Sequence, residues 1–208
     1  MKRLFRDRRS SSFTLVELLV VISIIAILAS VVIGAYSSAM KAALRAKAQV
    51  MASQIQTACM AYYNDYGVYP LSTNPAPTTQ AEATFGTTST DQQNWEYLIW
   101  ALCGNINAAT PGTAPSTLNV PNPRSIIYLS LNKSSIDANG IPINPVFSST
   151  PGTYFNISMD PTYSGILSNV PIFSPGLVGT SNMMGGVYVW ANCNVTGASN
   201  GTWWVHAP

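Results

Sequence analysis

One carboxylate lies inside a long apolar stretch near the start of this 208-residue chain. Glu17 is the fifth residue of an apolar run that covers residues 13–33. An ionisable side chain in hydrocarbon costs several kcal/mol unless it is paired, so such groups are rare and usually functional. The chemistry open to a lone carboxylate is charge pairing. We therefore expect Glu17 to meet a cationic partner.

The rest of the chain offers little for catalysis or metal binding. There is one histidine, His206, and neither a Gly-x-Ser-x-Gly elbow nor a phosphate-binding loop of the Gly-x-x-x-x-Gly-Lys type is present. Beyond residue 96 the only acidic side chains are Asp137 and Asp160. Two carboxylates are fewer than the cluster of oxygen donors that Ca²⁺ prefers. We expect no enzymatic activity, no cofactor and no metal site.

Three cysteines, Cys59, Cys103 and Cys193, allow at most one intramolecular disulfide. Cys59 falls within a helical pattern, so our interpretation of a possible pair is Cys103 with Cys193. The alternative is that all three are small buried apolar residues.

The apolar run is long enough to cross a membrane. As a helix, residues 13–33 would extend about 31 Å, which matches the hydrocarbon core of a bilayer. Residues 1–12 hold five of the ten basic side chains, and this excess predicts a cytoplasmic N-terminus with the C-terminal bulk outside. A classical secretory signal has its cleavage site after the run, and no convincing site follows this one.

The charge balance disfavours nucleic acid as a partner. The formal net charge is +2, but without residues 1–12 five bases remain against seven acids. A nucleic-acid surface needs clustered Lys and Arg on the working domain, and only Lys41, Arg45 and Lys47 cluster. Only 9% of the chain is charged. A later part rich in Ser, Thr, Asn, Gly and Pro is typical of secreted and cell-surface proteins.

The basic stretch, the string Phe-Thr-Leu-Val-Glu-Leu-Leu at residues 13–19 and the long apolar helix together resemble the N-terminus of type IV prepilins and type II secretion pseudopilins. The resemblance covers roughly residues 1–66. It implies that a membrane-embedded prepilin peptidase cuts between Ser12 and Phe13 and methylates the new amino group of Phe13. The family has Gly before the cut, whereas this chain has Ser12, a residue that is still small.

The same resemblance implies a role for Glu17 in assembly. Cleavage turns the nitrogen of Phe13 into a cation, and Glu17 of one subunit can neutralise it in a neighbour. The implied partners are further copies, other pilins or pseudopilins, the peptidase, an inner-membrane assembly platform and membrane lipid. The implied location is the inner membrane with a periplasmic head, and then a pilus or pseudopilus filament. The alternative from the residues alone is a signal anchor whose Glu17 reaches the interface.

The helix is predicted to continue past the membrane through residues 34–66. Apolar residues recur in steps of three and four and form one stripe: Leu44, Ala48, Met51, Ile55, Ala58 or Cys59, and Tyr62. Gly34 is either a place where the helix bends or a tolerated small residue. Gly67 is a candidate left-handed cap, and Pro70 prevents continuation. Residues 67–70 resemble the helix-to-loop transition of major pseudopilins.

Residues 67–208 are predicted to form a small head with long loops. A short helix is expected at 95–103, and short aromatic or β-branched segments predict strands at 126–131, 154–159, 186–191 and 202–206. The predicted fold class is α+β, with a long N-terminal helix packed against a small antiparallel sheet. The predicted segments are a leader (1–12), a membrane half (13–33), an amphipathic half (34–66) and a head (67–208).

Two head segments also resemble pseudopilin-like patterns. Residues 154–165 resemble a strand followed by an Asp-x-x-Tyr-Asp-Gly turn, in which Ser164 replaces the second Asp. Residues 187–190 resemble a later strand that ends in Trp. Trp190, Trp203 and Trp204, with Tyr188, could instead form an aromatic platform for a glycan. The functional rival is therefore a signal-anchored surface protein that binds a ligand and does not polymerise, although core packing of these aromatics is favoured.

Overall fold

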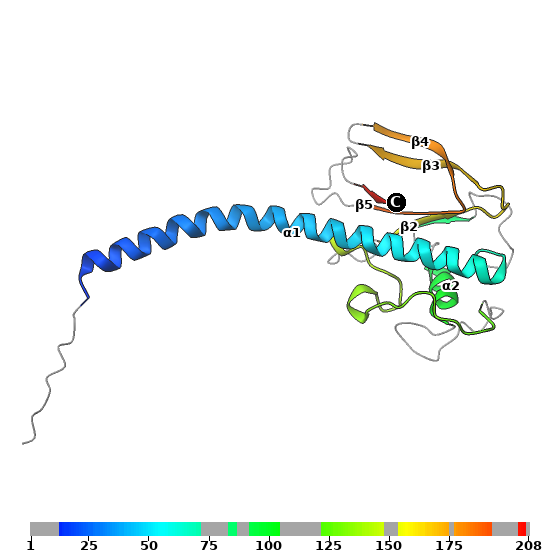
Figure 1. Cartoon of the computed structure of the whole chain (residues 1–208), viewed down its shortest axis with the longest axis horizontal. Coiled ribbons are helices and arrows are strands. Elements are labelled where there is room, and N and C mark those ends of the chain that lie inside the picture. The colour runs from blue at the N-terminus through cyan, green and yellow to red at the C-terminus, as the bar shows by residue number, and fades with distance from the viewer. Residues whose placement is uncertain are drawn as a thin grey trace, which may run out of the picture. The chain divides into compact units, whose positions relative to one another are not determined.

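The computed structural model describes residues 13–71, 83–86, 92–104, 122–147, 154–174, 177–192 and 204–206. The chain forms two compact units, Met1–Ala42 and Ala43–Pro208. Residues 43–66, which the sequence analysis groups with residues 34–42, belong to the second unit together with the head. The predicted fold class, α+β with a long N-terminal helix and a small antiparallel sheet, is confirmed (Figure 1).

The first element is the helix α1, Leu15–Tyr66. No proline interrupts it, and Gly34 is its only glycine, so local propensity does not oppose its length. It ends where Gly67 adopts a φ of +69° and donates its N–H to the carbonyl oxygen of Tyr63 at 2.7 Å. A left-handed glycine satisfies a free carbonyl at a helix end without a Cβ clash. The predicted helix and its glycine cap are both confirmed.

Within the second unit, α1 buries the predicted stripe. Ala48, Ile55 and Cys59 are fully covered, and Met51, Ala58 and Tyr62 are at most 7% exposed. Ala52 completes the stripe, whereas Leu44 is only half-buried. These side chains share one apolar core with residues of α2 and of the sheet. Burial of that core drives the packing of the head on the helix.

The main sheet has four antiparallel strands in the order β1-β2-β5-β6. Their bounds are Thr84–Phe85, Asn156–Met159, Val187–Asn192 and Trp204–His206. In β2 and β5, Ile157 lies opposite Val189 and Ser158 opposite Tyr188. The strands predicted at 154–159 and 186–191 are confirmed. The one predicted at 202–206 is confirmed for 204–206, and its first two residues lie outside the described ones.

A second sheet consists of β3, Ile166–Ser174, and β4, Leu177–Met184, which pair in antiparallel. No strand is predicted from the sequence for either half of this ribbon. Its strands hold Pro171 and several small polar residues, and the register shifts between Leu167 and Val170. Such a sequence lacks the two-residue alternation that marks a strand. Leu167 and Val170 pack on Tyr188 and Trp190 of β5, and this contact holds the ribbon.

The helix α2, Gln92–Leu102, confirms the predicted short helix and buries its last six residues. The strand predicted at 126–131 is wrong. Only Ile127 makes a bridge, to Cys103, and the N–H groups of Tyr128 and Leu129 both bond to the carbonyl oxygen of Leu102. The backbone of this segment therefore bonds to the C-terminal end of α2 and not to a neighbouring strand. Two short 3₁₀ turns follow, η2 at Lys133–Ser135 and η3 at Pro145–Phe147.

Candidate functional site

Glu17 and Thr14 bond to each other at the start of α1. Oε2 of Glu17 accepts hydrogen bonds from the backbone N–H of Thr14 at 2.9 Å and from its hydroxyl at 2.7 Å. The N–H of Glu17 donates in return to Oγ1 of Thr14 at 3.2 Å. This reciprocal pattern, Thr at the N-cap and Glu three residues later, is a capping box. Glu17 therefore has a role inside its own helix.

The sequence contains the capping-box spacing, Thr14-x-x-Glu17 immediately before an apolar run, whereas the prediction for Glu17 was a cationic partner. The negative carboxylate also interacts favourably with the positive end of the helix dipole. Both bonds use Oε2, and Oε1 accepts no hydrogen bond from the described residues. One oxygen thus remains for a further donor.

The helix that follows the cap is apolar on every side. Leu15 is 79% exposed, Ile25 57% and Ile33 72%, with similar values for the apolar residues between them. A helix that is apolar all round is stable only when lipid or other helices cover it. By length and composition, α1 is the one helix in the described part of the chain that could cross a membrane. The N-terminal helix therefore fits a membrane anchor.

The two serine hydroxyls of the apolar run are satisfied within the helix. Oγ of Ser23 donates to the carbonyl oxygen of Leu19 at 2.8 Å, and Oγ of Ser30 donates to that of Ile27 at 2.7 Å. A polar group in hydrocarbon must be bonded internally, and this back-bonding is the usual solution for serine. Neither hydroxyl then needs water or a neighbouring chain.

The predicted cleavage junction is described on one side only. Ser12 lies outside the described residues, and Phe13, the first described residue, is 71% exposed. Phe13 directly precedes the N-cap, Thr14, so its nitrogen lies just outside the helix. Cleavage after Ser12 and methylation of Phe13 stay predictions.

The turn predicted after β2 is organised around a buried carboxylate. Asp160 is 2% exposed and accepts four hydrogen bonds, two at each oxygen. Thr162 donates to Oδ1 from its N–H and hydroxyl, while Ser164 Oγ and Gly165 N–H donate to Oδ2. Burial alone would raise the pKa of Asp160, but these bonds outweigh it and hold the pKa below the ordinary value. Ser164 thus donates to Asp160 where the family pattern has a second acid.

Asp137 belongs to a separate network. Its Oδ1 accepts the N–H groups of Asn139 and Ile141, and its Oδ2 accepts the hydroxyl of Tyr154 at 2.8 Å. Among the residues that the structure describes, no three His, Cys, Asp or Glu side chains gather as metal ligands do. Asp137 and Asp160 each serve a turn of their own.

The predicted disulfide stays a prediction. Cys103 is a buried free thiol in this structure, with its Sγ donating to the carbonyl oxygen of Leu129 at 3.2 Å, and Cys193 lies outside the described residues. Burial raises the pKa of the Cys103 thiol to about 11, so it is protonated at neutral pH. Cys59 is also buried and free.

Two of the four residues of the predicted aromatic platform are buried. Tyr188 and Trp190 are 4% and 6% exposed, and their stacked rings lie under the β3–β4 ribbon. This burial agrees with core packing rather than with ligand binding. Trp203 lies outside the described residues, and the structure does not describe the side chain of Trp204.

Comparison with known families gives one match. Residues 7–33 match the family model of the prokaryotic N-terminal methylation motif. No curated protein and no solved structure matches the chain. The matched residues include the capping box and the apolar run, and the match confirms the family resemblance predicted from the same residues.

Proposed function

Since the chain has the N-terminal methylation motif of type IV prepilin-like proteins, we propose that it is a structural subunit that polymerises after processing. A prepilin peptidase removes residues 1–12 and methylates the nitrogen of Phe13. The apolar helices of many copies then bundle into a pilus or a secretion pseudopilus. Residues 67–70 favour the pseudopilus of a type II secretion system, and the head faces the periplasm until the subunit leaves the membrane.

The observation that carries this proposal is the contrast at the start of α1 between a charged cap and an apolar helix with nothing around it. A bundle of such helices covers the apolar surface that a single copy exposes. The cap adds a requirement, because the bundle also surrounds the carboxylate of Glu17. A buried charge must be paired, and the processed amino group of a neighbour is a cation of the right kind.

The capping box explains why the pairing can be specific. Oε2 of Glu17 is held by Thr14, which fixes the rotamer of the side chain and the direction of Oε1. A preorganised acceptor loses less entropy when it binds a donor. The proposed partner of Oε1 is the methylated amino group of Phe13 in the next subunit. Cleavage therefore creates the cation that assembly needs.

A pair of substitutions separates the charge of Glu17 from its capping role. Glu17→Gln removes the charge but keeps a residue that completes a capping box, whereas Thr14→Ala removes the hydroxyl and keeps the charge. We expect Glu17→Gln to reduce filament yield at least 10-fold and Thr14→Ala to reduce it less than threefold. The measurement is the amount of sheared filament, with membrane-inserted subunit as the loading control.

Mass spectrometry of the mature N-terminus tests the processing step. The expected product begins at a methylated Phe13. An intact leader, or a cut after residue 30, would contradict the proposal and favour the surface-protein alternative. Equal filament yields for Glu17→Gln and the unaltered chain would leave Glu17 with its capping role only.

A further inference from the structure

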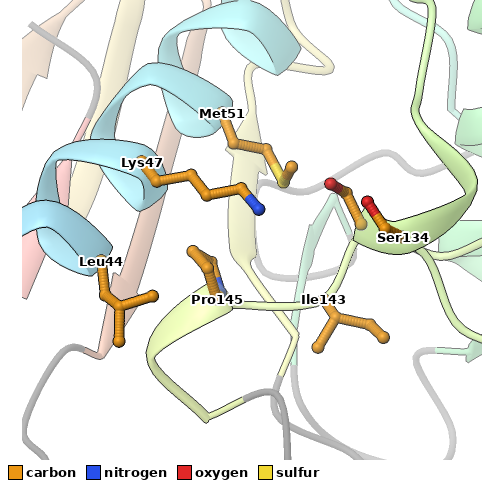
Figure 2. A pocket seen from close by; sticks show the side chains of 7 residues that line it. Leu44, Lys47, Met51, Ser134, Ile143 and Pro145 are labelled. Atoms are coloured by element: carbon orange, nitrogen blue, oxygen red, sulfur yellow. The ribbon is translucent and has the colours of Figure 1, made fainter. Parts of the chain in front are cut away.

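The head unit contains a small pocket that the proposed function does not use. Its volume is about 160 Å³, and it lies between α1 and the segment 134–145 (Figure 2). Leu44, Lys47 and Met51 of α1 line one side, and Ser134, Ser135 and Ile143 line the other. The pocket therefore combines a cation and two hydroxyls with an apolar wall. Such a set suits an anion that is attached to an apolar body.

The polar groups of the pocket are available to a ligand. Figure 2 shows the side chains of Lys47 and Ser134 pointing toward each other across it. Lys47 is exposed and forms no ion pair with any residue that the structure describes. The hydroxyl of Ser134 donates to Oδ1 of Asn132 at 3.1 Å, whereas that of Ser135 has no hydrogen bond within the described part. One ammonium group and one hydroxyl can therefore donate to an incoming oxyanion.

Basic residues flank the lining residues of the pocket along the chain. Residues 18–64 include Lys41, Arg45 and Lys47 but no acid. On the other side, Lys133 directly precedes Ser134. The acid nearest in sequence, Asp137, directs both oxygens to its own turn and to Tyr154, so it offers no ion-pair partner to Lys47. The local field therefore favours an anion.

The pocket follows closely on the membrane run in the sequence. Residues 18–40 are uncharged and, as a helix, extend about 35 Å, slightly more than the hydrocarbon core. Tyr36 is an aromatic residue of the type enriched at the membrane interface, and Lys41 is the first charge after it. Lys47 comes about 9 Å of helix later, within reach of the headgroup layer for a long side chain.

We propose that this pocket binds the phosphate headgroup of an anionic phospholipid in the leaflet on the side of the head. The Lys47 ammonium group pairs with the phosphate, and the hydroxyl of Ser135 donates to one of its oxygens. The apolar wall of Leu44, Met51 and Ile143 contacts the glycerol and the first carbons of the lipid. A subunit that waits in the membrane is thereby held with its head against the bilayer. The inference depends on the membrane anchor and not on polymerisation.

Hydrogen exchange in nanodiscs tests the proposal. The full chain is reconstituted at one copy per disc, in phosphatidylcholine with increasing mole fractions of phosphatidylglycerol. The amides of residues 133–147 should exchange more slowly as the anionic lipid fills the pocket. Lys47→Gln should raise the half-saturating mole fraction about fivefold, because the pocket loses its one ammonium–phosphate pair.

Lys41→Gln is the matched control. It removes the same charge from an exposed position on the same helix, closer to the membrane run but outside the pocket. We expect it to change the half-saturating fraction less than twofold. Unchanged near-ultraviolet circular dichroism shows that both variants keep their fold. Because each disc holds one copy, the result does not depend on whether the subunit polymerises.

Three results would overturn the proposal. Equal effects of Lys41→Gln and Lys47→Gln would mean a general attraction to the membrane without a pocket. Equal protection by inorganic phosphate in phosphatidylcholine discs would mean a site for free anions. Protection that requires two copies per disc and ignores the lipid would mean that a carboxylate of a neighbouring copy fills the pocket.

Discussion

The two ends of α1 are continuous in backbone but differ in what surrounds them. From Leu15 to Ile33 nearly every residue is apolar and exposed, whereas between Ala48 and Tyr62 a stripe is buried by the head of the same chain. In the second region, the apolar surface of the helix is buried within a single molecule. The first has its serine hydroxyls bonded within the helix and its apolar surface uncovered, so its stability depends on lipid or on other copies.

Truncating matched isoleucines gives the largest expected effect. Ile55 is fully buried and Ile25 is 57% exposed, on the same helix. Ile55→Ala should lower the free energy of unfolding of the head by about 2–5 kcal/mol, because it removes buried methyl groups and leaves a cavity. Ile25→Ala should change it by less than about 0.5 kcal/mol. Chemical denaturation in detergent, followed by tryptophan fluorescence, measures both. Similar losses for the two variants would mean that the regions are not energetically separate.

The end of α1 offers the next test. Asn122 is fully buried, its amide group donates to the carbonyl oxygens of Ala101 and Ile126, and its Oδ1 accepts the hydroxyl of Tyr66 at 2.6 Å. Asn122→Ala leaves these groups unpaired and should cost about 1–3 kcal/mol.

The readout for Asn122→Ala is hydrogen exchange by residue range. Faster exchange is expected at residues 62–66 and 99–103. The exchange rates in the membrane half of α1 should not change. Asn64→Ala, at an exposed position of the same helix end, is the control and should alter neither region. Faster exchange at residues 15–33 would show that the two ends of the helix are coupled.

The smallest expected effect is a pH dependence confined to the head. The pKa of Asp160 is held below its ordinary value, so its contribution to stability is present above the unfolded-state pKa of roughly 3.9 and is lost as the pH falls through the folded-state value. Asp160→Asn should cost about 1 kcal/mol at pH 6 and flatten the decline in the urea midpoint below the unfolded-state pKa of roughly 3.9. Glu17→Gln removes a carboxylate from the other region and should leave that profile unchanged. A steeper acid decline in Asp160→Asn would contradict this assignment.

How far the sequence predicted the fold depended on whether a signal was local. The length of α1, its buried stripe and its end at Gly67 follow from spacing and from single-residue propensities. The strand at 126–131 failed because Ile127 and its neighbours look like a strand, yet their partner is the end of α2. The β3–β4 ribbon was missed because Pro171 and its polar neighbours hide a pairing that depends on Tyr188 and Trp190.

The candidate site was predicted in position but not in geometry. Glu17 stood out because a charge in an apolar run is anomalous at any spacing. Its bond to Thr14 is equally local and follows from the Thr-x-x-Glu spacing, whereas a charge in an apolar run by itself indicates a distant partner. The turn at Asp160 shows the opposite case. Its outline was predicted, but Ser164 as a donor to the carboxylate depends on side-chain orientation, which a sequence does not give.

The internally bonded hydroxyls of Ser23 and Ser30 have a consequence for a filament of the proposed kind. With both hydroxyls turned back onto their own helix, the membrane half presents neighbours with hydrocarbon and no directional contact along its length. Contacts between such helices are then made by dispersion and by ridges packing into grooves, without hydrogen bonds. The capped end would then supply the one directional polar contact of the membrane half, and the shaft could stretch or twist without breaking a hydrogen bond along the apolar run.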